Sequence, residues 1–222
     1  MADKTWNDYY AKNTRVNLSN ILLHWKYLFS IVRTQPKNVL EIGCGPADHS
    51  VTLSQFFPSL NISVLDNDKD IIKKLKEKFT GRFQKFYLCD ILSAKEVKKQ
   101  KWKKDQFDVI YSQGLLEHFD EKDSEILIKN FIPYTPRLIF SIPSHMYPTR
   151  DFGNEILRDK KELVALLKPI KGIHYSVISY FPDIGIRTKL YTIKMKNMTI
   201  GQAIWFLLFG SCHYLVEVNR ED

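Results

Sequence analysis

Short apolar runs alternate with amphipathic segments along most of the chain. The runs are typical of buried or half-buried strands, and they lie at 39–42, 61–65, 86–89, 107–111, 137–142, 173–181 and 213–218. Between them, as at 47–57 and 68–79, apolar side chains recur at intervals of three and four, as they do on helices packed against a sheet. The pattern therefore predicts an α/β fold.

Two of the helices have predictable ends. Asp68 precedes the helix-like segment 68–79 as its expected N-cap. Asp159 and Glu162 have the spacing of a capping box, which predicts a helix that continues through Lys168.

Two segments lie outside this alternation. Residues 1–36 are predicted to form an N-terminal helical cap, because apolar residues recur at helical spacing toward its end. The stretch 182–211 is longer than a hairpin connection requires and is interpreted as an insertion in the core 37–222. Its apolar run, 204–209, is a core helix by default, with an oligomer contact or a roof over an apolar substrate as alternatives. The chain, 1–222, is predicted to be a single domain.

A glycine turn follows the first strand-like run. Gly43 and Gly45 allow a tight turn that brings the backbone close to a ligand. A dinucleotide-binding turn would carry a third glycine where this chain has Asp48, and a carboxylate at a helix N-terminus repels a pyrophosphate. We therefore expect a ligand that is not held by its phosphates.

Polar side chains occur at the ends of the first four runs. They are Glu41 beside the glycine turn, Asp66, Asp90 and the pair Ser112 and Gln113. We expect these four ends to converge on one crevice, where Asp66 can accept both hydroxyls of a ribose.

These motifs resemble those of the class I S-adenosylmethionine-dependent methyltransferases. The resemblance rests on 39–45, Asp66, 89–91 and 107–112 with 116–119, and it covers roughly residues 38–143. It implies a Rossmann-like, seven-stranded, mostly parallel sheet in the order 3-2-1-4-5-7-6, with the last strand antiparallel and helices on both faces. One departure is Ala47, where many members have glycine.

The resemblance also implies which residues hold S-adenosylmethionine and its product S-adenosylhomocysteine. The glycines would lie under the methionine part, Asp66 would hold the ribose, Asp90 the adenine amino group, and Ser112 with Gln113 would face the methionine end. The full predicted set is Glu41, Gly43, Cys44, Gly45, Asp66, Asn67, Asp90, Ile91, Ser112, Gln113 and Tyr10. Its carboxylates would attract the sulfonium cation. Simple capping of loops and helices is the alternative role for Glu41 and Asp66.

The catalytic and acceptor-binding candidates lie further along the chain. His118 and His145 are candidate bases, because imidazole titrates near neutrality; loop orientation is the alternative for His118. Tyr147 and Arg150, in the loop after the fifth run, are predicted to clamp an anionic or aromatic acceptor, with a plain surface crossover as the alternative. Tyr10 is predicted to belong to a lid, with packing on the sheet edge as its alternative.

Composition sets the expected environment. The three cysteines show no metal-binding spacing, and no apolar run is long enough to span a bilayer, so we expect a reduced, cytoplasmic protein. The formal net charge is +8, and residues 93–104 carry six lysines. Such a run can bind nucleic acid, but a solvated helix face is the preferred interpretation.

The predicted activity is methyl transfer to a small molecule. Cytosine C5 methylation requires a cysteine nucleophile, and none lies between Asp90 and Ser211. The motif typical of exocyclic-amine methylation is also missing after the fourth run, where the chain has Ser112-Gln113-Gly114-Leu115. An RNA or protein methyltransferase, suggested by the basic charge, and a non-catalytic cofactor-binding partner subunit remain as alternatives. A nicotinamide oxidoreductase is a distant fourth, and the oligomeric state stays open.

Overall fold

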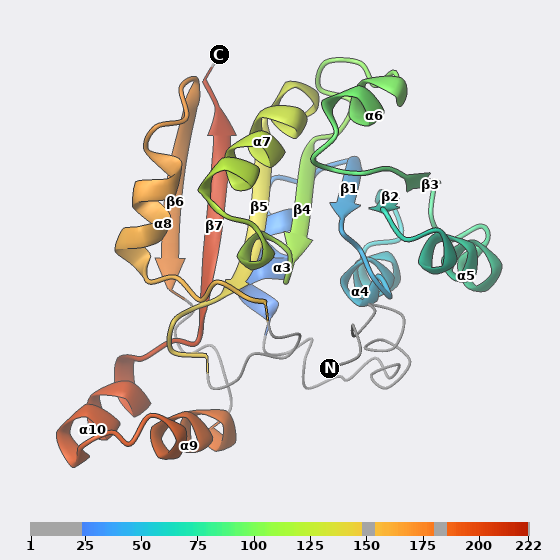
Figure 1. The fold of residues 1–222 in the computed structure, drawn as a ribbon. Helices are drawn as coiled ribbons and strands as arrows, with labels where there is room; N and C mark the ends of the chain where they lie inside the picture. The colour runs from blue at the N-terminus through green and yellow to red at the C-terminus, as the bar shows by residue number, and fades with distance from the viewer. Residues whose placement is uncertain (1–23, 148–153, 180–185, 222) are drawn as a thin grey trace.

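The computed structural model describes residues 24–147, 154–179 and 186–221. At its centre lies a seven-stranded sheet in the order β3-β2-β1-β4-β5-β7-β6 (Figure 1). The strands are β1 (Asn38–Ile42), β2 (Asn61–Asp66), β3 (Lys85–Leu88), β4 (Val109–Gln113), β5 (Arg137–Pro143), β6 (Ile173–Ser179) and β7 (His213–Arg220). The first five are parallel, and β7 is antiparallel to both of its neighbours. The predicted fold and strand order are confirmed.

Helices cover both faces of the sheet (Figure 1). The α-helices are α3 (Trp25–Val32), α4 (Asp48–Phe56), α5 (Lys69–Phe79), α6 (Ala94–Lys99), α7 (Glu121–Phe131), α8 (Lys160–Leu167), α9 (Ile186–Met195) and α10 (Ile200–Phe209). Two short 3₁₀ helices are η1 (Leu116–His118) and η2 (Ile132–Tyr134). Among the described residues, none of the helices combines the length and apolar character needed to cross a membrane.

Alternating strand residues build two apolar cores. Leu40 and Ile110 belong to the core under α6, α7 and α8, whereas Val39 and Val109 belong to the core under α3, α4 and α5. This period-two division is what the short apolar runs predict for strands buried on both faces.

The two predicted helix starts are confirmed. Asp68 accepts hydrogen bonds from the backbone N–H groups of Asp70 and Ile71. Asp159 and Glu162 form the reciprocal bonds of a capping box at the start of α8. These caps satisfy amide groups that have no partner within the helix.

The lysine-rich segment forms a shorter helix than predicted. The sequence favoured a helix over 93–104, but α6 ends at Lys99, and Lys101 has a positive φ of 55°. The reversal lets the Trp102 ring contact Tyr87 and Phe107, and burying this aromatic side chain outweighs continuing the helix. All six lysines of the segment are exposed, consistent with the solvated interpretation.

The predicted N-terminal cap is described only in part, as α3. Its buried face carries Tyr27, Leu28 and Ile31, whereas Trp25 and Phe29, which were counted among its recurring apolar positions, are 52% and 59% exposed. The buried face is set by strand β5, inside the sheet, on which α3 packs, and the spacing of apolar residues alone does not reveal this contact.

A buried ionic network fixes α3 to the sheet. The Glu217 carboxylate of β7 accepts hydrogen bonds from Ser30 Oγ of α3 and, at 2.9 Å, from the Arg137 guanidinium of β5. Arg137 also donates to the Ser30 carbonyl oxygen over 3.0 Å, and Arg33 pairs with Glu217 at 2.7 Å. The network ties three elements that are far apart in the sequence.

The insertion corrects one expectation. Residues 186–209 form α9 and α10, which lie together beyond one end of the sheet (Figure 1). Core packing was the default for 204–209, but Ile204, Trp205 and Leu208 are 54%, 61% and 54% exposed, and Phe206 is buried. The two helices pack mainly on each other, so only one side of α10 is covered.

Candidate active site

The glycine turn joins β1 to α4 in a left-handed backbone conformation. Gly43 and Gly45 have φ angles of 59° and 49°. A Cβ on Gly43 would lie 2.7 Å from Leu115 Cδ1, so both the backbone angle and the packing require glycine there. Ala47, also at positive φ (58°), precedes α4, and Asp48 is the first residue of that helix.

Glu41 lies fully buried behind this turn. Its carboxylate accepts a hydrogen bond from Ser50 Oγ, which also contacts the Tyr111 hydroxyl at 2.6 Å. Burial raises the pKa of Glu41 to about 8, with a further contribution from the charge of Asp48. Ser50 and Tyr111 were not among the predicted site residues, because a side-chain network across two strands and a helix leaves no local sequence signal.

Asp66 links the end of β2 to the glycine turn. One carboxylate oxygen accepts the Gly45 N–H at 2.9 Å and the other accepts the Asp68 N–H at 2.9 Å. Burial raises the pKa of this carboxyl group, an effect opposed by these hydrogen bonds. The Asn67 backbone N–H also interacts with this carboxylate. Its two oxygens together offer about four acceptor sites, so some acceptor capacity remains beyond these backbone groups. Acceptor capacity of this kind is what a ribose hydroxyl requires.

The ends of β2 and β3 place the other predicted adenosine contacts at the surface of the crevice. Asp90 and Asn67 are exposed, and Ile91 is buried. Asp90 Oδ1 accepts the N–H of Leu92 at 3.0 Å, while the Asp90 N–H donates to Glu96 at 2.9 Å. The Asp90 carboxylate is thus held at a fixed turn next to β2. Cys44 is buried in the glycine turn, where burial raises its thiol pKa.

Two buried polar groups near the end of β4 have no hydrogen-bond partner in the described part of the chain. They are Ser112 Oγ and Glu117 Oε2. Burial raises the pKa of Glu117 to about 8, and Glu155 raises it further while Arg158 lowers it. Gln113 is half-buried beside them, at the end of β4. Sequence reasoning quoted Glu117 only as part of a motif and gave it no role, because its burial depends on the distant segment 154–158.

That distant segment is tied to η1 by several bonds. The Ile156 N–H donates to the Glu117 carbonyl oxygen at 2.7 Å, and Arg158 donates to the Phe119 carbonyl oxygen at 2.8 Å. His118 Nδ1 lies 2.7 Å from Asn154 Oδ1. Burial lowers the pKa of the His118 imidazole. The bond to Asn154 is the contact that a loop-orienting histidine would make.

The loop after β5 carries the remaining described candidates. His145 is exposed. Its backbone N–H donates to the Arg158 carbonyl oxygen at 3.0 Å, and its backbone carbonyl oxygen accepts a hydrogen bond from Lys196 Nζ at 3.1 Å. The Tyr147 ring packs edge-on against His213, with ring centroids 5.2 Å apart. Tyr10 and Arg150 lie outside the described residues.

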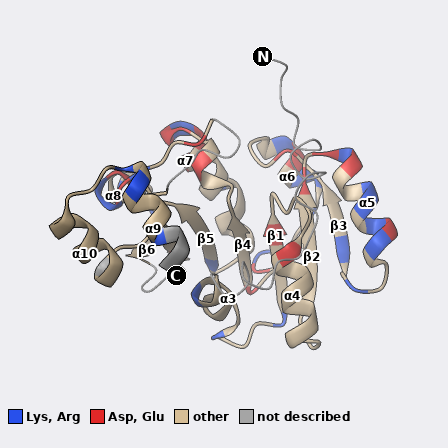
Figure 2. Cartoon of the chain, turned by 90° about the horizontal axis from the view of Figure 1, so that it is seen from below, with Lys and Arg blue, Asp and Glu red and all other residues tan. Residues whose placement is uncertain are grey.

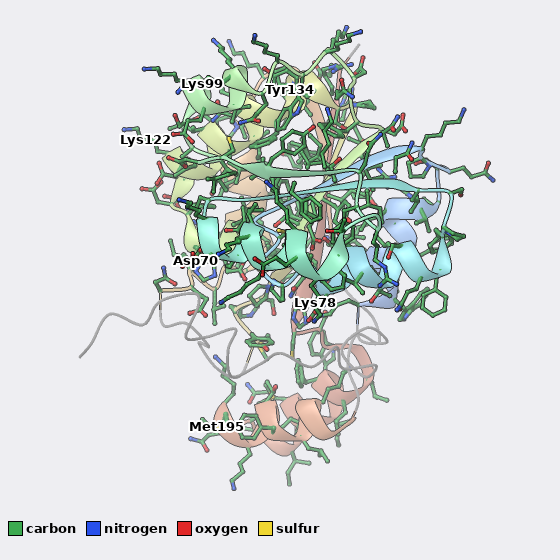
Figure 3. The ribbon with its side chains drawn as sticks, turned by 90° about the vertical axis from the view of Figure 1, so that its right-hand side faces the viewer. Asp70, Lys78, Lys99, Lys122, Tyr134 and Met195 are labelled. Carbon is green, nitrogen blue, oxygen red and sulfur yellow. The ribbon has the colours of Figure 1, made fainter. Side chains whose placement is uncertain are left out.

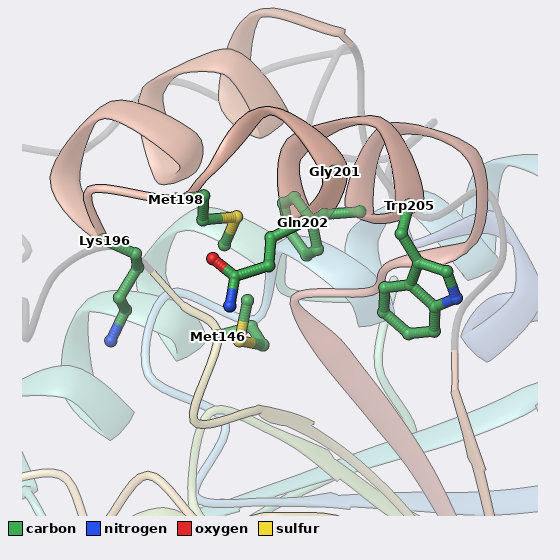
Figure 4. Close-up of a pocket in the computed structure, with 7 residues that line it drawn as sticks. Met146, Lys196, Met198, Gly201, Gln202 and Trp205 are labelled. Carbon is green, nitrogen blue, oxygen red and sulfur yellow. The ribbon is translucent and has the colours of Figure 1, made fainter.

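A pocket of about 450 Å³ opens between this loop and the insertion (Figure 4). It is lined by Met146, Lys196, Met198, Gly201, Gln202, Trp205 and Phe206. In Figure 4, Met146 points from the loop toward Met198 and Gln202 on the insertion. Its lining is mostly apolar and has one cation at the edge.

Known proteins show a consistent likeness. Residues 39–134 match the family model described as "Methyltransferase domain". A malonyl-[acyl-carrier protein] O-methyltransferase 2 from Ilyobacter polytropus is 32% identical over 93 residues, which are 37% of this chain and 34% of that protein. The chain thus matches about a third of the length of this curated relative.

The matched region contains the glycine turn and the carboxyl ends of β1, β2, β3 and β4. Over residues 39–134, which are less than half of the chain, the sequence is similar to a methyltransferase domain.

Solved structures have the same fold over nearly the whole chain. The plantazolicin methyltransferase BpumL in complex with S-adenosylhomocysteine has a TM-score of 0.63 at 14% identity, and the match covers 99% of this chain and 94% of that chain. A methyltransferase bound to the Trm112 methyltransferase activator of Haloferax volcanii has a TM-score of 0.70 at 11% identity, with coverages of 100% and 98%. The matched region 39–134 and the strands that follow it thus form one fold, which these structures share.

The site fits the family's cofactor in three respects. The glycine turn has no room for a Cβ at Gly43, Asp66 retains acceptor capacity, and Ser112 and Glu117 present buried polar atoms near the end of β4. Each is a feature that a bound adenosyl sulfonium compound would use.

Proposed function

We propose that this protein transfers the methyl group of S-adenosylmethionine to a small-molecule acceptor. The observation that carries the proposal is Asp66, a buried carboxylate that accepts the Gly45 N–H of the glycine turn and retains acceptor capacity. When bound, the cofactor supplies an electrophilic methyl group on a sulfonium. Asp66 would hold the ribose, Asp90 the adenine amino group, and Gly43 and Gly45 would allow the methionine part to approach.

The chain's contribution to the reaction is binding, alignment and proton handling. An activated methyl donor needs mainly proximity and an in-line approach by the acceptor. Glu117 would take up the acceptor's proton in its ionised form, which becomes the main form only above its pKa of about 8, and one of its oxygens has no hydrogen-bond partner in the described part of the chain. His118 would orient the segment 154–158 through Asn154, and His145 remains a second candidate base.

The acceptor would enter from the side of the loop after β5. The pocket at Met146 is large enough for an apolar group of modest size, and Lys196 could pair with an anionic substituent. The absence of a cysteine between Asp90 and Ser211 argues against cytosine C5 as the acceptor. We therefore expect a small acceptor with an apolar body, with Tyr147 and Arg150 as its further contacts.

The test is transfer of a radiolabelled methyl group to a panel of small apolar carboxylic acids, phenols and amines. We expect label in at least one acceptor, and loss of that transfer in Met146→Asp, which puts a charge into the pocket. Phe56→Asp, which alters an exposed phenylalanine on α4, is the control. Label in RNA or protein but in no small acceptor would replace this proposal by the macromolecular alternative.

The basic surface supports an RNA or protein acceptor as the second candidate. Residues 95–104 carry six exposed lysines opposed by Glu96. An RNA acceptor would be favoured if the protein retains RNA in a salt-sensitive manner and loses this retention when Lys98 and Lys99 are changed to Gln. The Haloferax volcanii structure contains an activator protein, so the assays are to be run on the isolated chain and with a candidate partner subunit.

A further inference from the structure

The two helices of the insertion expose a set of large apolar side chains. We name this set the insertion face: Leu190, Tyr191, Met195, Ile200, Ile204, Trp205 and Leu208. Their exposed fractions run from 46% at Tyr191 to 82% at Ile200. Scattered single exposed apolar residues are ordinary, but seven within 19 consecutive positions form a patch that calls for a partner.

The insertion face lies on a well-built pair of helices. On α10 the exposed residues Ile200, Ile204 and Leu208 follow one another at intervals of four, so they form one stripe. Phe206, on the opposite side, is buried, and Lys189 of α9 donates to the carbonyl oxygens of Phe206 and Leu207 at 3.4 Å and 3.2 Å. The exposed stripe is therefore the outer side of a packed unit.

The charged residues of the segment that carries this face are all basic. The sequence between Asp183 and Glu217 contains no acidic residue, and it contains Arg187, Lys189, Lys194 and Lys196. Lys194 and Lys196 are exposed, and α10 carries no charge at all (Figure 2). Lys189 is buried, so Lys194 and Lys196 are the basic side chains that the structure describes as exposed on this segment. Lysines beside apolar and aromatic side chains complement a surface that is anionic outside and apolar beneath.

The position of the face agrees with such a surface. Met195 lies at the end of the molecule opposite Lys99 and Tyr134 (Figure 3). The carboxyl ends of the parallel strands point toward the same end as α9 and α10 (Figure 1). Docking by this face would turn the mouth of the site toward the docking surface.

We propose that the insertion face docks the protein on an anionic lipid bilayer. The 10 residues of α10 are too few to span a bilayer, so the helix lies in the plane of the interface with its apolar stripe inserted. A second copy of the chain fits less well, because a two-fold contact would bring the exposed lysines of both copies together. This inference does not depend on the identity of the methyl acceptor.

The experiment is co-sedimentation of the full chain with vesicles. One set is phosphatidylcholine with about one third phosphatidylglycerol, and the other is phosphatidylcholine alone. We expect binding to the anionic set that weakens in high salt, because Lys194 and Lys196 contribute through screened electrostatics. The variant Ile204→Gln/Leu208→Gln removes two inserted side chains and should lower the partition coefficient about tenfold or more.

A matched control removes two apolar side chains elsewhere. Phe29→Gln/Phe56→Gln changes residues that are 59% and 68% exposed on α3 and α4 and should bind vesicles like the parent. Circular dichroism establishes that both variants are folded. Failure of the parent to bind anionic vesicles, or equal losses in the two variants, would overturn the proposal. The proposal would also be overturned if the parent is a dimer in solution and only the Ile204→Gln/Leu208→Gln variant is a monomer, because a second copy would then cover the face.

Discussion

Glu41 on β1 and Glu117 on η1 are buried carboxyl groups. Burial raises the pKa of each to about 8. Glu41 has a hydrogen bond from Ser50, whereas Glu117 Oε2 has no such partner in the described part of the chain. A buried carboxyl group without a donor is costly to ionise, so retaining it suggests a use in binding or proton transfer.

These raised pKa values make stability fall with rising pH. Between the unfolded pKa of about 4.5 and the folded pKa of about 8, the folded state holds a proton that the unfolded state has lost. Each glutamate should therefore lower the free energy of unfolding by about 1.4 kcal/mol per pH unit in that window. Glu117→Gln should remove the contribution of Glu117 to this decrease of the free energy of unfolding with pH.

Urea denaturation from pH 6.5 to 7.5 measures this slope. Burial lowers the pKa of His24 and His49, so both lose protons on folding near pH 6.5, but they do so in the parent and in Glu117→Gln alike and cancel in the comparison of the two slopes. The same slope in Glu117→Gln and the parent would show that Glu117 is ionised in the folded protein.

Asp66 carries the ribose prediction. Asp66→Asn keeps the shape of the side chain but replaces one acceptor oxygen by an NH₂ group, and it should weaken S-adenosylhomocysteine binding by about 1–3 kcal/mol. Asp68→Asn, a change of the same kind that preserves a good N-cap, should leave affinity unchanged. Equal affinities of the Asp66 variant and the parent in calorimetric titration would assign the ribose to another residue.

The glycine turn shows what an element demands of its residues. Gly43 and Gly81 both have positive φ, at 59° and 80°, but a Cβ meets Leu115 Cδ1 at 2.7 Å in the first and nothing within 4 Å in the second. Comparing Ala at these two positions therefore separates backbone strain from crowding.

We expect Gly81→Ala to cost about 1 kcal/mol of folding free energy, from the left-handed backbone alone. Gly43→Ala should cost about 1–3 kcal/mol more, because Leu115 must move. Thermal or urea unfolding measures both, and Leu115→Ala added to Gly43→Ala should recover part of the excess. Equal costs for the two single variants would show that the turn adapts freely.

The elements of the core and the presence of an insertion were predictable, but the exposure of the insertion's apolar run was not. Runs such as 39–42 and 61–65 are buried on both faces, so their strand assignment follows from local pattern. The exposure of Trp205 depends on where α9 packs, and the burial of Glu117 depends on the segment that contains Arg158. Both are set by contacts distant in sequence, which residue periodicity does not encode.

The network around Glu217 acts on the whole molecule, because it joins α3 to β5 and β7. Burial alone would raise the pKa of Glu217, but the hydrogen bonds from Ser30 and Arg137 lower it overall. The stabilising contribution of Glu217 is therefore fully present above the ordinary glutamate pKa. It is lost as the pH falls through the lowered pKa of Glu217 in the folded protein.

Glu217→Ala should lower the free energy of unfolding at pH 7 by about 3–5 kcal/mol, because Arg137 stays buried without its counter-charge. The control is Glu125→Ala, which removes the partner of Lys129 on the exposed side of α7 and should cost no more than about 1 kcal/mol. Urea denaturation compares them. A loss at Glu217 as small as that at Glu125 would refute a structural role for the network.

The measurement that tests the account most directly is calorimetric titration of the protein with S-adenosylmethionine and S-adenosylhomocysteine, with NAD as the comparison. The account predicts that the first two bind and that NAD does not, because the Asp48 carboxylate in the first turn of α4 would repel a pyrophosphate at that helix N-terminus. Binding of NAD in preference to both adenosyl compounds, or no binding of either adenosyl compound, would contradict the assignment of this site.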